Sequence, residues 1–234
     1  MCYYTQRSID RDKALLGSFM TVTTTPAQTT KQLLLEKGLA LLTERGYDAT
    51  SIGDVLKETG VPKGSFYHYF ASKEAFCAEL ITLYESKKRA AYGPVFEDTS
   101  LSPLNRLRTI LANSIRELQT HDFQRGCLIG TLGQEMAMRS PELQAALDGV
   151  YHRWGALYYD CFTQAVTAGE LPTTVDIHSL IHTYVMTLQG AILEAKITHA
   201  PLSFQRLHWL FFEQLGKPSH RLNEQDETLL ALPK

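Results

Sequence analysis

Residues 50–74 read TSIGDVLKETGVPKGSFYHYFASKE, and this stretch decides the fold of the N-terminal part of the chain. Ser51 and Asp54 form a capping-box pattern, which predicts the start of a helix because each side chain can bind the other residue's backbone N–H. Gly60 predicts the end of that helix, and Pro62 prevents it from continuing. A second short helix follows at once, so the two helices must cross steeply.

The second helix of this stretch is only about two turns long. Phe66, Tyr69 and Phe70 recur at helical spacing and are expected to face the core. The outward positions are left to a lysine, two hydroxyl-bearing residues and an imidazole: Lys63, Ser65, Tyr67 and His68. A short helix that exposes such side chains is typical of a recognition helix for the DNA major groove. The alternative is that Tyr67 and His68 are ordinary solvated side chains.

The composition is that of an ordinary globular protein, with 234 residues, 44% hydrophobic and 21% charged. The chain has no run of about eighteen apolar residues, so we expect no membrane-spanning helix. Residues 7–22 end in ALLGSFMTV, which faintly resembles a signal peptide. However, Asp10 and Asp12 interrupt its basic part and no small-residue cleavage site follows. We therefore expect residues 1–28 to be a disordered leader.

The cysteines and histidines do not form the pattern of a metal or disulfide site. Four cysteines lie far apart without a CxxC pair, which indicates a reducing compartment: Cys2, Cys77, Cys127 and Cys161. His178 and His182 are an i, i+4 pair that could in principle share a metal ion, but no third ligand is evident. We expect them to pack as polar groups, and we predict no metal and no cofactor.

Net charge gives little support for a general affinity for nucleic acid. The formal net charge is −2, and residues 29–75 balance their lysines and arginine with as many aspartates and glutamates. Nucleic-acid-binding domains are often basic. Any DNA affinity must therefore come from a few well-placed hydrogen-bond donors, from helix N-termini and from the pairing of two DNA-binding domains in a dimer.

The remaining sequence is helical in pattern throughout. Helices are expected at about 30–45, from Ser72 to a break at Gly93-Pro94, and then at 104–118, 126–138, 141–169, 177–201 and 203–216, with Ser203 as the cap of the last. No alternating strand pattern occurs. We predict an all-α protein with an N-terminal three-helix helix-turn-helix domain (29–75), a C-terminal helical bundle (76–216) and a loosely held polar tail (217–234).

The last predicted helix is apolar around most of its circumference, through Phe204, Leu207, Trp209, Leu210, Phe211, Phe212 and Leu215. A helix that is apolar nearly all round must be buried on both sides. One side can face its own bundle, and the simplest cover for the other is the same pair of last helices in a second subunit. We therefore predict a homodimer through the last two long helices. The alternative is a fully internal helix.

The segment from Leu34 to Phe76 resembles the DNA-binding domain of TetR-type transcriptional regulators. The match rests on GYDATSIGDVLKETGVPKGSFYHYFASKEAF, with its Gly46-x-x-x-Thr50 entry, its VPKGSFYHYF core and its SKE continuation. The resemblance implies a bacterial, cytoplasmic repressor with an all-helical C-terminal domain for ligand binding and dimerisation. It also implies a near-palindromic double-stranded DNA operator and release by a small-molecule inducer.

The same resemblance suggests which residues contact DNA. Lys63 reaches a guanine edge or a phosphate, and Ser65 is short enough for a base edge. Tyr67 and His68 resemble the family's phosphate-contacting pair. The remaining candidates are Ser51 and Lys73 for phosphates, and Gly64 for a close approach to the duplex.

A second resemblance covers RGCLIGTLGQEM (125–136) and GAILEAKI (190–197). Both look like the branch whose members respond to reactive electrophiles such as acrylate or N-ethylmaleimide. This resemblance makes Cys127 the candidate sensor, activated by Arg125, by a helix N-terminus or by Lys196. An adduct or oxidation there would shift its helix and change the angle between the DNA-reading heads. The alternatives are that Cys127 is a small buried hydrophobe and that the inducer is a reversible apolar ligand.

Catalytic motifs are not found in the sequence. It contains no G-x-S-x-G elbow, P-loop, dinucleotide fingerprint after a strand or zinc-protease motif, so we predict no catalytic residue and no enzyme activity. A rival reading is a helical enzyme or binding protein whose helix-turn-helix no longer functions, which the neutral head would favour.

Overall fold

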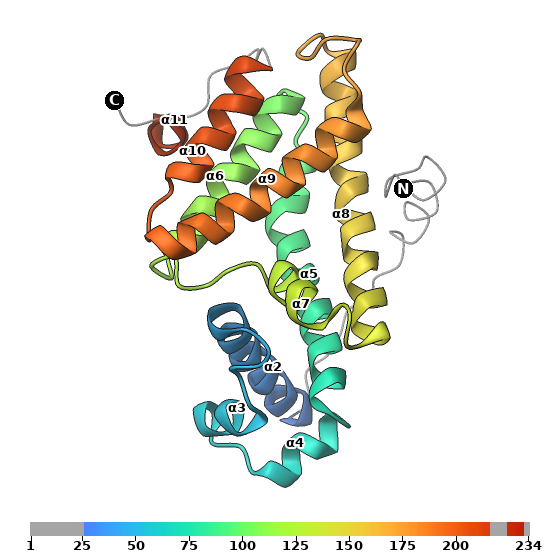
Figure 1. Ribbon diagram of the computed structural model, residues 1–234, viewed down its shortest axis with the longest axis vertical. Coiled ribbons are helices and arrows are strands. Elements are labelled where there is room, and N and C mark those ends of the chain that lie inside the picture. The colour runs from blue at the N-terminus through green and yellow to red at the C-terminus, as the bar shows by residue number, and fades with distance from the viewer. Residues whose placement is uncertain (1–25, 216–223, 232–234) are drawn as a thin grey trace. The chain divides into compact units, whose positions relative to one another are not determined.

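The computed structural model describes residues 26–215 and 224–231, and these residues are helical with no strand among them (Figure 1). The predicted all-α class is therefore confirmed. None of the helices in these ranges is both long and apolar enough to cross a membrane. In chain order the helices are α2 (Pro26–Arg45), α3 (Ile52–Thr59), α4 (Lys63–Tyr69), α5 (Lys73–Glu97), α6 (Pro103–Gln119), α7 (Leu128–Met136), α8 (Pro141–Thr167), α9 (Ile177–Thr198), α10 (Leu202–His208), η2 (Trp209–Gln214) and α11 (Glu224–Leu230).

The described chain packs as two units. One contains residues 26–88 and 125–151, and the other contains residues 89–124, 152–215 and 224–231. Residues 125–151, which contain α7 and the first part of α8, belong to the unit of the helix-turn-helix, while the functional domains 29–75 and 76–216 stay a prediction. The predicted leader, residues 1–28, lies almost wholly outside the described residues. Helix α2 begins at Pro26 rather than near residue 30, which suits proline's tolerance of a first helical turn.

The helix-turn-helix has the local signals that the sequence predicts. The Ser51 hydroxyl oxygen accepts the Asp54 N–H at 3.1 Å, and the Asp54 carboxylate accepts the Ser51 N–H at 2.8 Å. The Ser51 hydroxyl, which also donates to the Asp54 carboxylate, and the Ser51 N–H together lower the pKa of Asp54. Gly60 ends α3 in the left-handed conformation with φ of 68°, and its N–H donates to the Leu56 carbonyl at 2.9 Å. The predicted capping box and glycine stop are confirmed.

Three phenylalanines hold α4 against the rest of its unit. Phe66, Phe70 and Phe76 are almost fully buried, and their ring centroids lie 4.8–5.2 Å apart. Burial of each ring contributes roughly 1.5–3 kcal/mol. Gly38 on α2 makes room for this cluster, since a Cβ there would lie 2.2 Å from Cζ of Phe76. Tyr69 is only half-buried.

The predicted break at Gly93-Pro94 is wrong, because α5 continues through Pro94 to Glu97. Proline lacks a backbone N–H, so Pro94 removes one helical hydrogen bond, and its ring crowds the preceding turn. Packing of the following residues offsets this loss. Phe96 lies against the core of its unit, with its ring centroid 5.5 Å from that of Tyr158.

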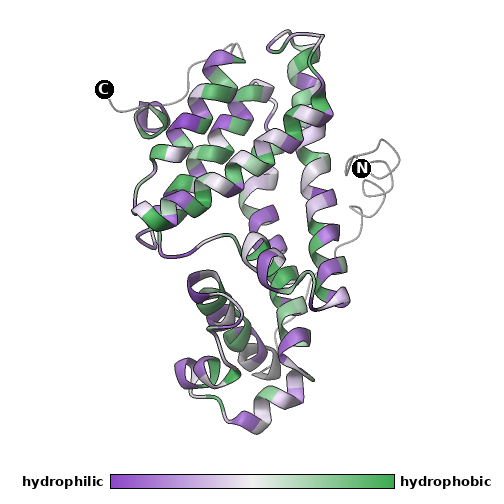
Figure 2. Cartoon of the chain, in the orientation of Figure 1, coloured by the Kyte–Doolittle hydropathy of each residue, from purple (hydrophilic) through white to green (hydrophobic). Residues whose placement is uncertain are grey.

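The second packing unit is built around Tyr184 of α9. Its side chain is fully buried, and the rings of Tyr158, Phe162 and Phe211 lie 5.1–5.8 Å from it, centroid to centroid. These residues come from α8, α9 and η2, so one aromatic cluster joins the three elements. Figure 2 shows polar and apolar residues side by side along these helices, as expected where only one face of a helix packs on a core.

The last helix departs from the prediction in two ways. Ser203 does not cap it: Pro201 holds that position, and the buried Ser203 hydroxyl donates to the Ala191 carbonyl of α9 at 3.4 Å. The helix is also not uniform, since α10 ends at His208 and a π-helical segment, η2, follows from Trp209. A serine before an apolar run is a capping signal only when its hydroxyl has no better partner.

The expectation of a loosely held tail is wrong for residues 224–230. They form α11, where Asp226 and Leu230 are buried. Asp226 is paired with the guanidinium of Arg116 on α6, which compensates for burial of its charge. The rest of the predicted tail lies in ranges that the structure does not describe, apart from Ala231.

The capping box yields a stability prediction. Ser51→Ala removes the hydroxyl that accepts the Asp54 N–H, and we expect a loss of about 1 kcal/mol in the free energy of unfolding. Urea denaturation measures this loss. Ser51→Asn, which keeps a capping oxygen, is the matched control and should retain most of the stability. Equal stability of Ser51→Ala and the wild-type protein would contradict the role of this cap.

Candidate DNA-binding surface and sensor region

One face of α4 is open to solvent and carries hydrogen-bond donors. Lys63, Gly64, Tyr67 and His68 are exposed, and Ser65 is half-buried. Tyr67 is 48% exposed, which is unusual for a large aromatic residue beside a packed core. The Lys63 ammonium lies 6.0 Å from the centroid of the Tyr67 ring, so the two side chains share one surface. The predicted division is confirmed for the buried Phe66 and Phe70 and for the exposed Lys63, Tyr67 and His68, whereas Ser65 and Tyr69 are both half-buried.

Gly64 has no packing reason to be glycine. A Cβ at this position would meet no atom of the protein within 4 Å. Glycine inside a helix costs about 1 kcal/mol relative to alanine. The surface at Gly64 is therefore open enough for a duplex to approach the backbone closely.

Ser51 and Lys73 are engaged within the protein. The Ser51 hydroxyl donates to the Asp54 carboxylate at 2.6 Å, so a phosphate would compete with this bond. The Lys73 ammonium donates to the carbonyl of Tyr47 and lies 3.8 Å from the centroid of its ring. An ammonium has three donors, so this contact leaves Lys73 able to bind a phosphate as well.

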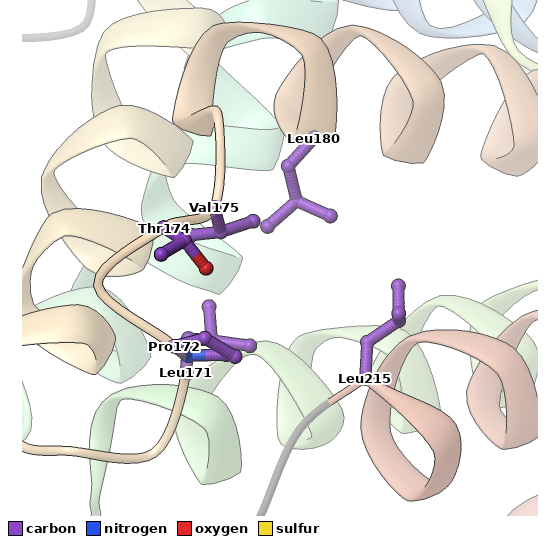
Figure 3. Close-up of a pocket in the computed structure, with 6 residues that line it drawn as sticks. All are labelled: Leu171, Pro172, Thr174, Val175, Leu180 and Leu215. Atoms are coloured by element: carbon purple, nitrogen blue, oxygen red, sulfur yellow. The ribbon is translucent and has the colours of Figure 1, made fainter.

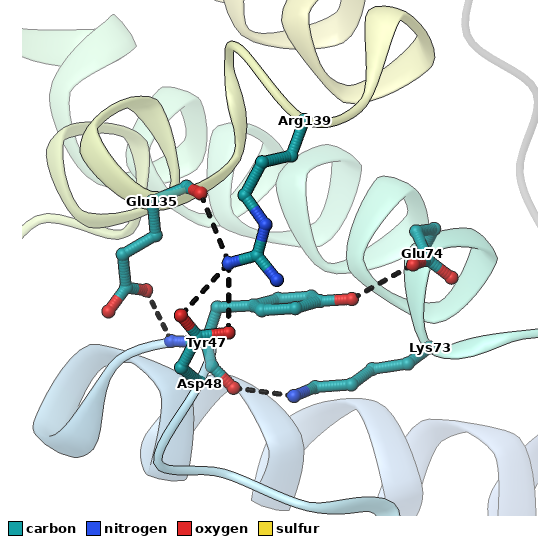
Figure 4. A network of polar contacts seen from close by, with 6 residues as sticks. All are labelled: Tyr47, Asp48, Lys73, Glu74, Glu135 and Arg139. Carbon is teal, nitrogen blue, oxygen red and sulfur yellow. Dashed lines mark hydrogen bonds and ion pairs between the residues drawn. The ribbon is translucent and has the colours of Figure 1, made fainter.

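Tyr47 is the centre of a polar network that joins three parts of its unit (Figure 4). Its N–H donates to the Glu135 carboxylate, and its hydroxyl donates to Glu74 at 3.1 Å. Burial and the Glu74 carboxylate raise the pKa of Tyr47. The ring lies between the Lys73 side chain and the Arg139 guanidinium, whose centre is 5.8 Å from the ring centroid.

Arg139 completes this network. One nitrogen of its guanidinium donates to both carboxylate oxygens of Asp48 at 2.9 Å. Sequence reasoning did not single out Tyr47, Glu135 or Arg139. The spacing of Glu135 and Arg139, one helical turn apart, would have placed them on one face, but nothing local indicates what that face contacts.

Cys127 caps the N-terminus of α7, and its side chain forms no capping hydrogen bond. The residue is 6% exposed and is followed by the fully buried Leu128 and Ile129. Just before it, the N–H of Gly126 donates to the Thr43 carbonyl of α2 at 2.8 Å. The prediction that Cys127 lies at the start of its helix is confirmed, and the helix begins at Leu128 rather than at Gly126.

The other two thiols in the described residues have environments that oppose ionisation. Burial raises the pKa of Cys77 to about 12 and that of Cys161 to about 12. The Cys161 thiol also donates to the Pro103 carbonyl at 3.2 Å. Because the thiolate is the reactive form, both thiols are protected from electrophiles.

Lys196, the other predicted sensor residue, lies on α9 and is half-buried. It belongs to the unit that contains residues 152–215, whereas Cys127 belongs to the unit with the helix-turn-helix. The approach of Lys196 to Cys127 therefore stays a prediction.

A small apolar pocket lies at the turn between α8 and α9 (Figure 3). It has a volume of about 200 Å³, and its lining is almost entirely aliphatic: Leu171, Pro172, Thr174, Val175, Leu180 and Leu215. Such a lining suits a small apolar molecule and offers few groups for orienting a polar one.

The two histidines of α9 have different neighbours. The ring of His178 lies 5.1 Å from that of Tyr159, and Nδ1 of His182 lies 2.9 Å from the sulfur of Met186. Among the residues described, no group of three or more His, Cys, Asp or Glu side chains is arranged to hold a metal ion.

Large apolar side chains remain exposed along α9 and η2. Their exposed fractions run from 40% to 70%: Met186, Leu193, Ile197, Trp209 and Leu210. A fully internal last helix is therefore not what the structure contains. Large exposed apolar side chains on α9 and on η2 are typical of surfaces that another protein covers.

Two family models match the chain. Residues 34–80 match the family described as bacterial regulatory proteins of the tetR family, and residues 103–210 match the tetracyclin repressor-like C-terminal domain. These ranges cover the helix-turn-helix and most of the described helices that follow it.

Several curated proteins are similar in sequence. The transcriptional regulator AcuR of Cereibacter sphaeroides is 39% identical over 73% of this chain and 78% of its own length. The repressor DhaR of a Mycobacterium species is 30% identical over 83% of this chain and 96% of its own length. The repressor NemR of Escherichia coli is 29% identical over 51% of this chain and 60% of its own length.

Solved structures show the same fold. A regulatory protein TetR from Rhodobacter sphaeroides has a TM-score of 0.76 and 36% identity, over 80% of this chain and 98% of that one. The reduced form of Escherichia coli NemR has a TM-score of 0.73 and 23% identity, over 82% of this chain and all of that one.

Proposed function

This chain belongs to the TetR family of bacterial regulatory proteins, and from that premise we propose that it is a repressor released from its operator by a small molecule. Its place in the family makes it a DNA-binding transcriptional regulator. The relatives named above are transcriptional regulators as well, and no enzymatic role is proposed. We infer that it acts in the bacterial cytoplasm, where its DNA is.

The observation that carries this proposal is the open face of α4. A seven-residue helix presents a lysine, an exposed tyrosine and an exposed histidine from a rigid aromatic base. In our proposal Lys63 and Ser65 contact bases or phosphates in the major groove, while Tyr67 and His68 bind phosphates. Ser51 and Lys73 add phosphate contacts at the edges, and Gly64 lets the backbone approach.

The DNA assignment is tested with Tyr67. Tyr67→Ala should lower affinity for every duplex sequence alike, by about tenfold if one hydrogen bond to a charged group is lost. Fluorescence anisotropy with a labelled duplex from upstream of the gene measures this loss. Tyr67→Phe, which lacks only the hydroxyl, should show most of this loss of affinity. Lys73→Gln should reduce the slope of log affinity against log salt concentration by about 0.9. Unchanged affinity of Tyr67→Ala would contradict the assignment.

We propose that two copies pair through α9 and the last helical segment, α10 with η2. The exposed apolar residues of α9 and η2 support this pairing, because burying them against a second copy removes them from water. Pairing would place two α4 helices roughly 34 Å, or one turn of DNA, apart. A near-palindromic operator follows from that symmetry.

The dimer is tested by sedimentation. Analytical ultracentrifugation at micromolar concentration should give a dimer for the wild-type protein. The double substitution Leu193→Glu and Ile197→Glu should give a monomer, because it adds two charges to the surface that pairs. Met138→Glu, at a site that is 96% exposed and outside this surface, is the control and should remain dimeric. A wild-type monomer would exclude the pairing.

For the inducer, we propose a reactive electrophile that modifies Cys127. Its position at the N-terminus of the nine-residue α7 supports this, because a helix N-terminus is a common setting for reactive cysteines. Similarity to the repressor NemR, whose solved structure is described as a reduced form, also supports thiol chemistry. An adduct would not fit a site that is 6% exposed unless α7 moved.

The sensor is tested by alkylation. Among the thiols of the described residues, N-ethylmaleimide should label Cys127 first and lower affinity for the duplex, while Cys77 and Cys161 stay unlabelled because burial raises the pKa of both thiols to about 12. Peptide mass spectrometry locates the adduct, and anisotropy measures release. Cys127→Ser should keep its affinity after treatment. If N-ethylmaleimide released Cys127→Ser from the duplex to the same extent as the wild-type protein, Cys127 would be ruled out as the sensor.

A second candidate is a repressor that binds a small apolar ligand reversibly, without thiol chemistry. The aliphatic pocket at Leu171, Val175 and Leu180 favours it (Figure 3). In that case electrophiles that resemble the ligand would release DNA without leaving a covalent mark on Cys127. The alkylation experiment therefore separates the two inducer classes.

A further inference from the structure

Helix α7 is attached to α2 and its following turn at both ends. At its N-terminal end, the Gly126 N–H donates to the Thr43 carbonyl, at 2.8 Å. At its C-terminal end, Glu135 accepts the Tyr47 N–H, and Arg139 just beyond the helix pairs with Asp48. All of these residues lie in one packing unit, so a movement of α7 cannot leave the helix-turn-helix unaffected without breaking one set of contacts.

The C-terminal attachment is specific in its geometry. Gly46 has φ of +88°, and a Cβ at this residue would lie 2.5 Å from a carboxylate oxygen of Glu135. Glycine is thus needed here twice, for its left-handed backbone and for the approach of Glu135. A side chain at position 46 would occupy the space that the Glu135 carboxylate now fills.

Loss of this attachment would be costly for the turn between α2 and α3. Tyr47 is 5% exposed, and its N–H donates to the Glu135 carboxylate. A buried N–H that loses its acceptor destabilises the folded state unless water replaces that acceptor. Both side chains of the Asp48–Arg139 pair are more than half exposed, so this ion pair orients the two segments but contributes little to stability. Glu135 is therefore the principal contact and Arg139 the auxiliary one.

We infer that Glu135 and Arg139 are positioning residues that transmit a displacement of α7 to the DNA-reading head, directly through the turn at Tyr47 and Asp48. This inference rests on the proposed function for its meaning, because it names the route between the inducer site and DNA. The same turn holds the Lys73 ammonium through the Tyr47 carbonyl and ring (Figure 4). A shift of α7 therefore changes the position of a proposed phosphate donor, with no need to alter α4 itself.

The test displaces α7 without any electrophile. Cys127→Trp places a bulky ring at a position that is 6% exposed, and it is combined with three backgrounds. The first is wild type and the second is Glu135→Ala with Arg139→Ala. The third is Lys31→Ala with Glu79→Ala, which removes a 2.7 Å ion pair between α2 and α5 in the same unit and leaves the contacts of α7 intact. Circular dichroism melting confirms that each protein is folded, and Cys127→Met replaces Cys127→Trp if it is not.

Two readouts are taken. Anisotropy with the labelled upstream duplex gives the DNA affinity, and hydrogen exchange gives the protection of the Tyr47 amide. In the wild-type and Lys31/Glu79 backgrounds, Cys127→Trp should lower affinity about tenfold, within the usual range of allosteric coupling, and speed exchange at Tyr47. In the Glu135/Arg139 background, Cys127→Trp should lower duplex affinity by less than about a further threefold. It should not speed exchange of the Tyr47 amide any further.

Equal effects of Cys127→Trp in all three backgrounds would overturn the inference, as would no effect in any of them. Failure of the proposed function looks different. If the wild-type protein does not bind the duplex, the regulatory role fails, while the exchange at Tyr47 still decides whether Glu135 and Arg139 carry the displacement. If electrophiles do not act through Cys127, the comparison of the three backgrounds is unaffected, because no electrophile is used in it.

Discussion

The packing of Phe66, Phe70 and Phe76 is the interaction on which the DNA-reading surface depends. A helix of seven residues is too short to be stable alone, so α4 exists because its inner face is buried. Once that face is fixed, the helical repeat determines which residues point outward. The exposed lysine, tyrosine and histidine are therefore presented by a rigid base, and binding a duplex does not first require this helix to be ordered.

Local signals predicted the head well and the rest of the chain less well. The capping box at Ser51, the glycine stop at Gly60 and the buried face of α4 each depend on residues within one or two helical turns. The misplaced cap at Ser203 and the break expected at Pro94 failed for a different reason. In both cases a distant partner, Ala191 or the Tyr158 ring, changed the outcome.

The same distinction applies to the candidate site. Outward residues of α4 and the position of Cys127 at a helix start could be read from spacing, since both are properties of one helix. The contacts of Tyr47 with Glu135 could not, because the two residues lie 88 positions apart and no alternation or motif links them. The acidic residues that balance the charge of residues 29–75 also have a structural role, since Asp48, Asp54 and Glu74 accept hydrogen bonds or pair with charges inside the protein.

The shared packing of α7 with the helix-turn-helix limits how this protein can be recombined with its relatives. A chimera that transplants residues 26–75 alone would separate Tyr47 from its acceptor and place Gly46 opposite an unrelated side chain. A transplanted DNA-binding module that keeps this packing unit whole is discontinuous and includes residues 125–151. Engineers who exchange operator specificity between such regulators should therefore cut the chain where packing ends, and not where the DNA-binding motif ends.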